Sequence, residues 1–214
     1  MGRKNTIYSS SYPYHITARS NNKEWFGLTS DICWSIFSDY LRFLNIGFGV
    51  KIHAFVLMKN HYHLLASFPD HNMAEAMTRF MTEVSRVMNF ERGSINHSFG
   101  SRYKPSIIQN DFYFANAYKY VLNNPVRAGI SEYAENYPYS SLNGQLGFSK
   151  LGFSINERFS DKIPKFENSE SYLAWVNKNT TSALNLEISR SIRRTTFEFS
   201  GRQMERLGLS LTSL

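Results

Sequence analysis

The chain has 214 residues, with 42% hydrophobic and 19% charged side chains. These values are typical of one folded domain with an appendage, and they exclude a disordered chain or a coiled coil. No apolar run of about eighteen residues is present, so we expect no membrane span. The first residues lack the apolar stretch of a secretory signal. The single cysteine, Cys33, excludes an internal disulfide framework and a multi-cysteine zinc site, and we expect a cytoplasmic location.

The net charge is +7, and aromatic residues make up 15% of the chain. Lysine and arginine neutralise phosphates and exposed rings stack on unpaired bases, so this combination favours a nucleic-acid partner. The alternative is a phenylalanine-rich core under a solubilising surface charge. Because the basic residues are spread along the chain, any binding surface has to be assembled by the fold.

Alternating patterns and short apolar runs predict four strands, at residues 14–19, 50–58, 61–67 and 102–109. Lys59-Asn60 is the expected turn of a hairpin between the second and third strands. Pro105 favours an edge position for the fourth strand, because proline cannot donate a hydrogen bond to a neighbouring strand.

Apolar side chains at three- and four-residue intervals predict helices at residues 30–44, 73–89, 111–124, 172–178 and 184–192. Ser30 and Asp111 are the expected N-terminal caps of the first and third of these. Pro125 is expected to end the third helix, because the residue before a proline is driven out of the helical region.

The order of these elements is typical of an α+β fold with a ferredoxin-like antiparallel sheet and helices on one face. A further helix follows the fourth strand, and the rest of the chain forms a mostly helical extension. We expect residues 1–147 to form the functional domain and residues 148–214 to form a basic extension packed on it. The first and third strands are central in this topology, so the third strand is well placed for a rigid site.

The third strand contains the sequence His61-Tyr62-His63. Side chains at i and i+2 of a strand point to the same face, so the two imidazoles lie side by side and can begin a divalent-metal site. Tyr62 and Leu64 then face the core. The alternative is that two histidines occur by chance on a solvated strand.

The second candidate feature is the helical pair Tyr120 and Asn124. Residues four apart share one helix face, so the Asn124 amide oxygen could complete a hard-cation site beside the Tyr120 phenol. The alternative is a buried tyrosine in an aromatic-rich helix that ends at an Asn-Pro pair.

Two other histidines lie on predicted strands. His53 shares the alternation phase of Lys51 and Phe55 on the second strand, and His15 lies on the first. We interpret both as structural histidines, with a supporting role at the site as the alternative.

The two candidate features together resemble the HUH-type single-tyrosine transposases. The resemblance rests on the segments 57–65 (LMKNHYHLL) and 120–129 (YVLNNPVRAG), and the second is most similar to the REP-associated tyrosine transposases. Supporting matches are the segments 14–19 (YHITAR), 102–104 (RYK) and 137–141 (YPYSS), so the resemblance covers roughly residues 12–145. Lys59 departs from the family pattern, which usually has proline there; this alters the turn and leaves the expected ligands in place.

The resemblance implies a metal-dependent DNA-cutting mechanism and makes residues 1–147 the catalytic domain. His61, His63 and Asn124 would hold Mg²⁺ or Mn²⁺, and histidine is a softer ligand than magnesium prefers. Tyr120 would attack the scissile phosphate, forming a 5′-phosphotyrosine and releasing a 3′-hydroxyl. The implied partner is single-stranded DNA with a hairpin or palindromic repeat.

The expected DNA contacts are basic or aromatic residues near the two motifs, namely Arg19, Arg102, Tyr103, Lys104, Lys119 and Arg127. The alternative for each is a solvated surface residue. We expect a nucleoid-associated protein in the cytoplasm, and a monomer and a homodimer are equally compatible with the sequence.

Three rival functions remain open from the sequence. The first is a domesticated protein that binds hairpin DNA without cutting it. The second is an HUH replication initiator or a relaxase-like nickase, although such proteins are generally larger. The third is a histidine phosphoesterase of unrelated fold, which would not need the helical Tyr120.

Overall fold

The computed structural model describes residues 6–95, 97–156, 161–178 and 181–209. A four-stranded antiparallel sheet organises the first half of the chain, with the strand order β2-β3-β1-β4. Its elements are β1 (Tyr14–Arg19), a short 3-10 turn (Asn21–Lys23), α1 (Ser30–Phe48), β2 (Lys51–Leu57), β3 (His61–Ser67), α2 (Met73–Arg92) and β4 (Lys104–Ile107). The expected ferredoxin-like α+β fold is confirmed, and β1 and β3 are its central strands.

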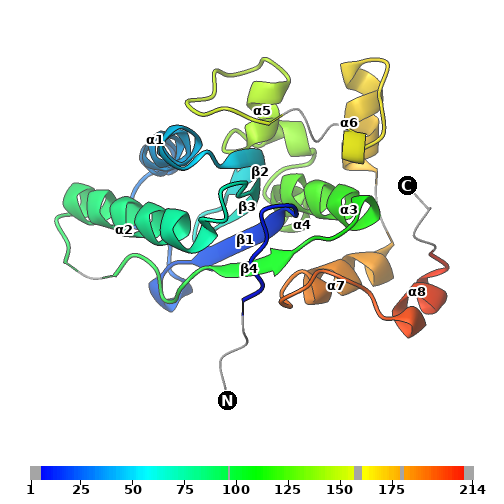
Figure 1. Ribbon diagram of the computed structural model, residues 1–214. Coiled ribbons are helices and arrows are strands. Elements are labelled where there is room, and N and C mark those ends of the chain that lie inside the picture. The colour runs from blue at the N-terminus through cyan, green and yellow to red at the C-terminus, as the bar shows by residue number, and fades with distance from the viewer. Residues whose placement is uncertain (1–5, 96, 157–160, 179–180, 210–214) are drawn as a thin grey trace.

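The sheet separates two hydrophobic cores. On one face, α1 and α2 cover a core that includes Tyr62 and Leu64 of β3 (Figure 1). On the other face lies α3 (Asp111–Leu122), which is almost entirely buried and contacts β2 and β3. Tyr62 and Leu64 therefore face the core under α1 and α2, as predicted, and the residues that alternate with them face α3.

Two helices are capped one residue earlier than expected. Thr29 precedes α1, and its hydroxyl accepts a hydrogen bond from the backbone N–H of Ile32. Asn110 precedes α3, and its side chain accepts from the backbone N–H of Tyr113. The predicted caps Ser30 and Asp111 are instead the first helical residues. The cap belongs to the last extended residue, where a side-chain oxygen can reach back to the free N–H groups of the first turn.

The helix with Tyr120 ends earlier than predicted, at Leu122, and a short helix α4 (Asn124–Arg127) follows. Pro125 therefore begins the second helix instead of ending the first. Proline has no N–H to donate to the carbonyl of Val121, which interrupts the hydrogen bonds of α3, but its fixed φ suits a first helical turn.

A bulge in β2 changes the expected direction of His53. Ile52 pairs with Ala66 and Ala54 pairs with Leu65, so His53 is the extra residue of the bulge. Its ring contacts Phe114 of α3, on the opposite face of the sheet from Phe55. The prediction that His53 shares the alternation phase of Phe55 is therefore wrong.

The chain beyond α4 packs along the sheet and α3. Its elements are a 3-10 turn (Ala134–Asn136), α5 (Ser141–Gln145), α6 (Ser169–Asn177), α7 (Ser182–Ser191) and α8 (Gly201–Leu207). α6 and α7 lie near the expected positions, whereas α5 and α8 are additional. Val176, Ile188, Ile192 and Phe197 are buried in the same core as α3. No helix in the described part of the chain is long and apolar enough to cross a membrane.

The outer strands of the sheet are each covered by a later segment. Ile107 of β4 donates to the carbonyl of Thr195 and accepts from the backbone N–H of Phe197. On the other side, Leu57 of β2 donates to the carbonyl of Tyr139. These contacts satisfy backbone groups that an open sheet edge would leave unpaired.

The low pKa values of two buried histidines predict that the protein loses stability in acid. Burial lowers the pKa of both His15 and His53 to about 3, so both stay neutral in the folded state, whereas the unfolded chain binds protons near pH 6.5. The stabilisation is complete above that value and is lost as the pH falls from about 6.5 towards 3. Each histidine then lowers the free energy of unfolding by up to about 1.4 kcal/mol per pH unit.

Urea unfolding between about pH 8 and about pH 5 measures this slope. His53→Gln removes one of the two groups and should make the fall with pH shallower by that amount. If His53→Gln has the same pH slope as the wild type, His53 does not contribute to the loss of stability in acid.

Candidate functional site

The pairing of β1 with β3 brings the histidines of the two central strands together. His63 lies opposite Thr17, His61 lies opposite Arg19, and His15 pairs with Leu65 two residues further along β3. Side chains of paired residues share a face of the sheet. His15, His61 and His63 therefore all project towards α3.

His63 and His15 form a buried pair. The Nε2 atom of His15 is 2.8 Å from the Nδ1 atom of His63, and the two rings stack with their centroids 5.0 Å apart. The Tyr120 ring meets both rings edge-on, with centroid distances of 5.7 Å to His63 and 6.0 Å to His15. The structure thus brings Tyr120 of α3 directly against the histidines of the sheet.

His61 is more exposed than His63 and is held by its neighbour Asn60. Its Nδ1 atom is 2.7 Å from the side-chain oxygen of Asn60. Since the amide oxygen can only accept, the Nδ1–H of His61 donates, and the lone pair remains on Nε2. The Asn60 side chain also donates to the carbonyl of Lys23, so both polar atoms of its amide are hydrogen-bonded.

The environment keeps both β3 histidines neutral. Burial, followed by the nearby charges of Arg19 and Arg193, lowers the pKa of His61 to about 4. Burial lowers the pKa of His63 well below its usual value, and the neighbouring histidines and arginines act in the same direction. A neutral imidazole has a lone pair for a cation, whereas an imidazolium has none.

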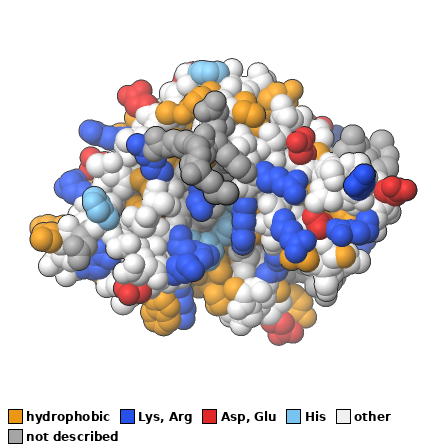
Figure 2. Space-filling model, turned by 90° about the horizontal axis from the view of Figure 1, so that it is seen from below, with side chains coloured by type: hydrophobic (Ala, Val, Ile, Leu, Met, Phe, Trp, Pro, Cys, Tyr) orange, Lys and Arg blue, Asp and Glu red, His pale blue; other side chains and the backbone are white. Residues whose placement is uncertain are grey.

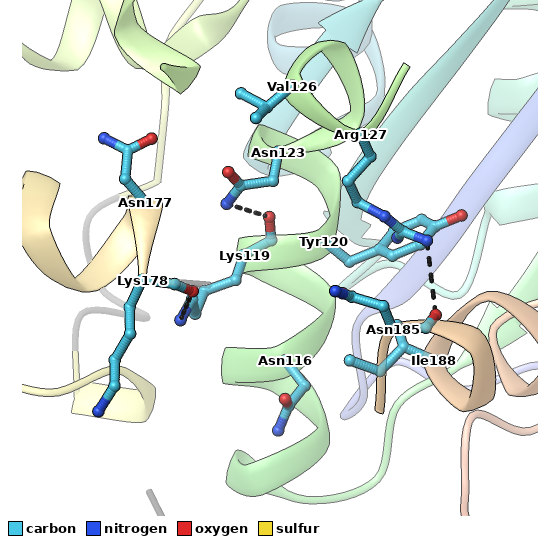
Figure 3. Close-up of a pocket in the computed structure, with 10 residues that line it drawn as sticks. All are labelled: Asn116, Lys119, Tyr120, Asn123, Val126, Arg127, Asn177, Lys178, Asn185 and Ile188. Atoms are coloured by element: carbon cyan, nitrogen blue, oxygen red, sulfur yellow. Dashed lines mark hydrogen bonds between the residues drawn. The ribbon is translucent and has the colours of Figure 1, made fainter. Parts of the chain in front are cut away.

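An arginine lies over the Tyr120 ring. The guanidinium carbon of Arg127 lies 4.5 Å from the ring centroid, and Figure 3 shows this side chain extended across the phenol. Arg127 also donates to the Ser189 hydroxyl at 2.6 Å and to the carbonyl of Asn185 at 3.4 Å, both on α7. Tyr120 is consequently only 8% exposed, between the sheet and a cation that α7 helps to position.

Asn124 lies immediately after the break between α3 and α4. Its side-chain NH₂ donates to the carbonyl of Tyr120 at 2.7 Å and lies 3.4 Å from that of Val121. The side-chain amide thereby donates to backbone carbonyls at the point where Pro125 interrupts the helix. Because the nitrogen is used in this way, the Asn124 oxygen is the atom left for a ligand.

The residues that could hold a divalent cation are His61 and His63, whose ring centroids lie 5.1 Å apart, and the sequence-predicted amide of Asn124. Within the described residues no group of three or more His, Cys, Asp or Glu side chains could hold a metal. Two imidazoles and one amide oxygen leave positions free for water or a phosphate, as a catalytic ion requires.

A pocket beside Tyr120 is lined by residues of α3, α4 and α7 and by the C-terminal end of α6 (Figure 3). Its lining includes Lys119, Tyr120, Arg127, Lys178 and Ile188. The Lys119 ammonium lies 5.2 Å from the Trp175 ring centroid, and burial together with Lys178 lowers its pKa to about 8. Lys119 is therefore at the site but partly engaged within the protein.

The remaining expected DNA contacts divide between the two faces of the sheet. Arg19 and Lys104 are exposed, and both pair with residues of the histidine face. Arg102 is exposed just before β4. Tyr103 packs against the core under α1 and α2, and burial raises its pKa to about 12, so its ring lies on the face opposite Tyr120. Seen from below, a recessed histidine surface lies among Lys and Arg side chains (Figure 2).

The sequence indicates Asn60 only as a turn residue, although an amide next to a candidate ligand histidine is a usable signal. It leaves a supporting role for His15 open as an alternative, and the contact of His15 with His63 depends on strand register. The position of Arg193 depends on the path of the extension, so no local pattern reveals it.

Comparisons with known proteins give the family. The sequence profile of the family "Transposase IS200 like" matches residues 8–124, which is more than half of the chain. This span contains β1 to β4, α3 and all four residues Tyr120, His61, His63 and Asn124. The chain therefore belongs to the IS200-like transposase family and has a transposase-family role.

A solved structure agrees on the fold. A REP-associated tyrosine transposase bound to a REP hairpin superimposes with a TM-score of 0.58 at 16% sequence identity, covering 78% of this chain and 96% of that one. A protein from Deinococcus radiodurans assigned as a transposase has a TM-score of 0.39 at 17% identity, covering 64% and 96%. No curated protein sequence matches this chain. The fold is that of the REP-associated tyrosine transposase.

The two β3 histidines should differ in their structural importance. His63→Ala removes a buried ring and leaves His15 without its hydrogen-bond partner, so we expect a loss of about 2–3 kcal/mol in the free energy of unfolding. His61 is partly exposed, and among the described residues its ring hydrogen-bonds to the neighbouring Asn60, so His61→Ala should cost less than about 1 kcal/mol. Urea unfolding of the metal-free variants measures both losses, and equal losses would contradict the described packing.

Proposed function

We propose that this protein is a metal-dependent endonuclease and strand transferase that cuts single-stranded DNA through a covalent tyrosine intermediate. The observation that supports this most strongly is the edge-on contact of the Tyr120 ring with His63. A nucleophile and the expected metal ligands come from distant parts of the chain and meet on one face of the sheet. A purely structural tyrosine has no need of two neutral histidines with lone pairs beside it.

The proposed reaction is a transesterification at phosphorus. The Tyr120 oxygen attacks the scissile phosphate, the phenolic proton is lost, and the bond to the 3′ oxygen breaks as that oxygen gains a proton. The products are a 5′-phosphotyrosine and a free 3′-hydroxyl. A divalent cation held by His61, His63 and Asn124 would polarise the phosphate. The reverse attack by another 3′-hydroxyl rejoins strands without ATP.

Arginines around the site suit this reaction. Arg127 lies over the Tyr120 ring, which places a positive charge next to the attacking group. Arg19 lies across from His61, and Arg193 lies close enough to lower the pKa of that histidine. These cations provide the positive field that a phosphate chain requires.

The proposed substrate is single-stranded DNA with a hairpin repeat. The solved protein of the same fold is bound to a REP hairpin. In this chain, Arg19 and Lys104 are exposed on the histidine face and are the proposed phosphate contacts.

The cutting activity is tested with labelled single-stranded hairpin DNA and Mn²⁺. We expect a protein–DNA adduct that survives SDS, and Tyr120→Phe should abolish it because the attacking oxygen is removed. Tyr118→Phe is the matched control: Tyr118 lies on the same helix, but its hydroxyl bonds to Tyr172 and Gln145 away from the histidines. Tyr118→Phe should retain the adduct.

Two results would overturn the assignment. An adduct formed by Tyr120→Phe would show that another residue is the nucleophile. Hairpin binding by the wild type without any adduct, in either Mg²⁺ or Mn²⁺, would support a DNA-binding protein that does not cut.

Arg19 should contribute to hairpin binding through charge. Arg19→Gln should reduce the slope of log K against log salt by about 0.7, the value for one phosphate contact with a single strand. Fluorescence anisotropy at several salt concentrations measures the slope. Arg42→Gln, an exposed arginine on α1 across the sheet, is the control and should leave it unchanged. Equal slopes for wild type and Arg19→Gln would remove Arg19 from the binding surface.

A further inference from the structure

His15 is a buried group that the proposed reaction does not use. It is 1% exposed, lies on β1, and its Nε2 atom is within hydrogen-bond distance of only one described side chain, the His63 imidazole at 2.8 Å. Burial is the main cause of the low pKa of both rings, so the pair is neutral. One neutral imidazole must donate in this bond and the other must accept.

The direction of this bond decides which atom of His63 can bind a cation. If the Nδ1–H of His63 donates to His15, the lone pair of His63 lies on Nε2. If the Nε2–H of His15 donates instead, His63 accepts at Nδ1 and carries its own proton on Nε2, where it blocks coordination. The tautomers of the two rings are therefore coupled.

The proposed reaction requires the first arrangement. A cation beside Tyr120 needs a lone pair on Nε2 of His63, so the proton of His63 has to lie on Nδ1, the atom that is 2.8 Å from His15. His15 then accepts this proton at Nε2 and carries its own proton on Nδ1.

The tautomer of His61 is also set by a hydrogen bond, in this case to Asn60. Its Nδ1–H donates to the Asn60 oxygen, which leaves the lone pair on Nε2. Both β3 histidines would then present Nε2 to the same space beside Tyr120. A ligand histidine that donates its other ring N–H to an acceptor is the usual arrangement at metal sites.

We propose that His15 is a positioning residue: by accepting from the Nδ1–H of His63, it keeps the Nε2 atom of His63 available to a divalent cation. This inference rests on the proposed metal-dependent reaction.

The first test reads the tautomer directly. Long-range ¹H–¹⁵N correlation spectra of the metal-free wild type at neutral pH distinguish a histidine protonated on Nδ1 from one protonated on Nε2. We expect Nδ1–H for both His63 and His15. A wild-type His63 with its proton on Nε2 would overturn the proposal, and this reading does not depend on any variant that has to fold.

The second test measures Mn²⁺ affinity by the electron paramagnetic resonance signal of free Mn²⁺. His15→Leu, which has no acceptor, should weaken binding by about 10- to 100-fold. His15→Gln places an amide near the Nε2 position and should recover most of the affinity. His53→Leu is the matched control: His53 is also buried but bonds to Ser67 at the other end of the sheet, so its affinity should equal that of the wild type.

The outcomes separate this inference from the proposed function. If the wild type binds Mn²⁺ and forms the DNA adduct while His15→Leu binds Mn²⁺ equally well, the role of His15 is wrong and the reaction stands. If the wild type fails to bind Mn²⁺ or to form the adduct, the proposed function fails. If His53→Leu weakens Mn²⁺ binding as much as His15→Leu, the effect is general loss of packing, and the positioning role is overturned.

Discussion

The site depends on the fixed alternation of the central strand β3. This strand is hydrogen-bonded on both sides, to β2 and to β1, so it cannot rotate about its axis without breaking two ladders. Tyr62 is fully buried in the core under α1 and α2, which commits that face of the strand to packing. His61 and His63 are then forced onto the opposite face. Rigid backbone pairing thus sets the direction of the two imidazoles, and Asn60 of the preceding turn holds the His61 ring.

The second half of the site is supplied by the helix that covers this face. α3 has to bury an apolar surface against β2 and β3, and in doing so it places Tyr120 against His63 and His15. The break at Pro125 then sets the path of the chain beyond the nucleophile. It puts Asn124 at the start of a new helix and turns Arg127 back over the Tyr120 ring. The packing of α3 and the N–H that Pro125 lacks therefore set the positions of Tyr120, Asn124 and Arg127.

The C-terminal extension is joined to the sheet and to the site. Its segment around Phe197 pairs with β4, and α7 contacts Arg127 next to the nucleophile. The same stretch carries Ile192 to His15 and Arg193 towards His61. Residues beyond the family segment 8–124 therefore influence the electrostatics of the histidines.

Sequence reasoning succeeded where the information is local and failed where it depends on register or tertiary packing. The i, i+2 geometry of His61 and His63 follows from strand alternation alone, and the element order identifies the central strands. The bulge at His53 arises from how β2 is matched to β3, and no composition signal marks it. The pairing of His15 with His63 requires the β1–β3 register, which only the assembled sheet defines. Helix caps differed by one residue because neighbouring polar side chains compete for the same N–H groups.

We propose that one face of the sheet and the end of α3 together hold a divalent cation beside Tyr120. Anomalous X-ray diffraction from crystals of the full chain soaked in Mn²⁺, with data collected at the manganese edge, locates such an ion. We expect one strong peak bounded by Nε2 of His61, Nε2 of His63 and the side-chain oxygen of Asn124. A peak coordinated by other residues, or coordination through the Nδ1 atoms, would contradict the claim.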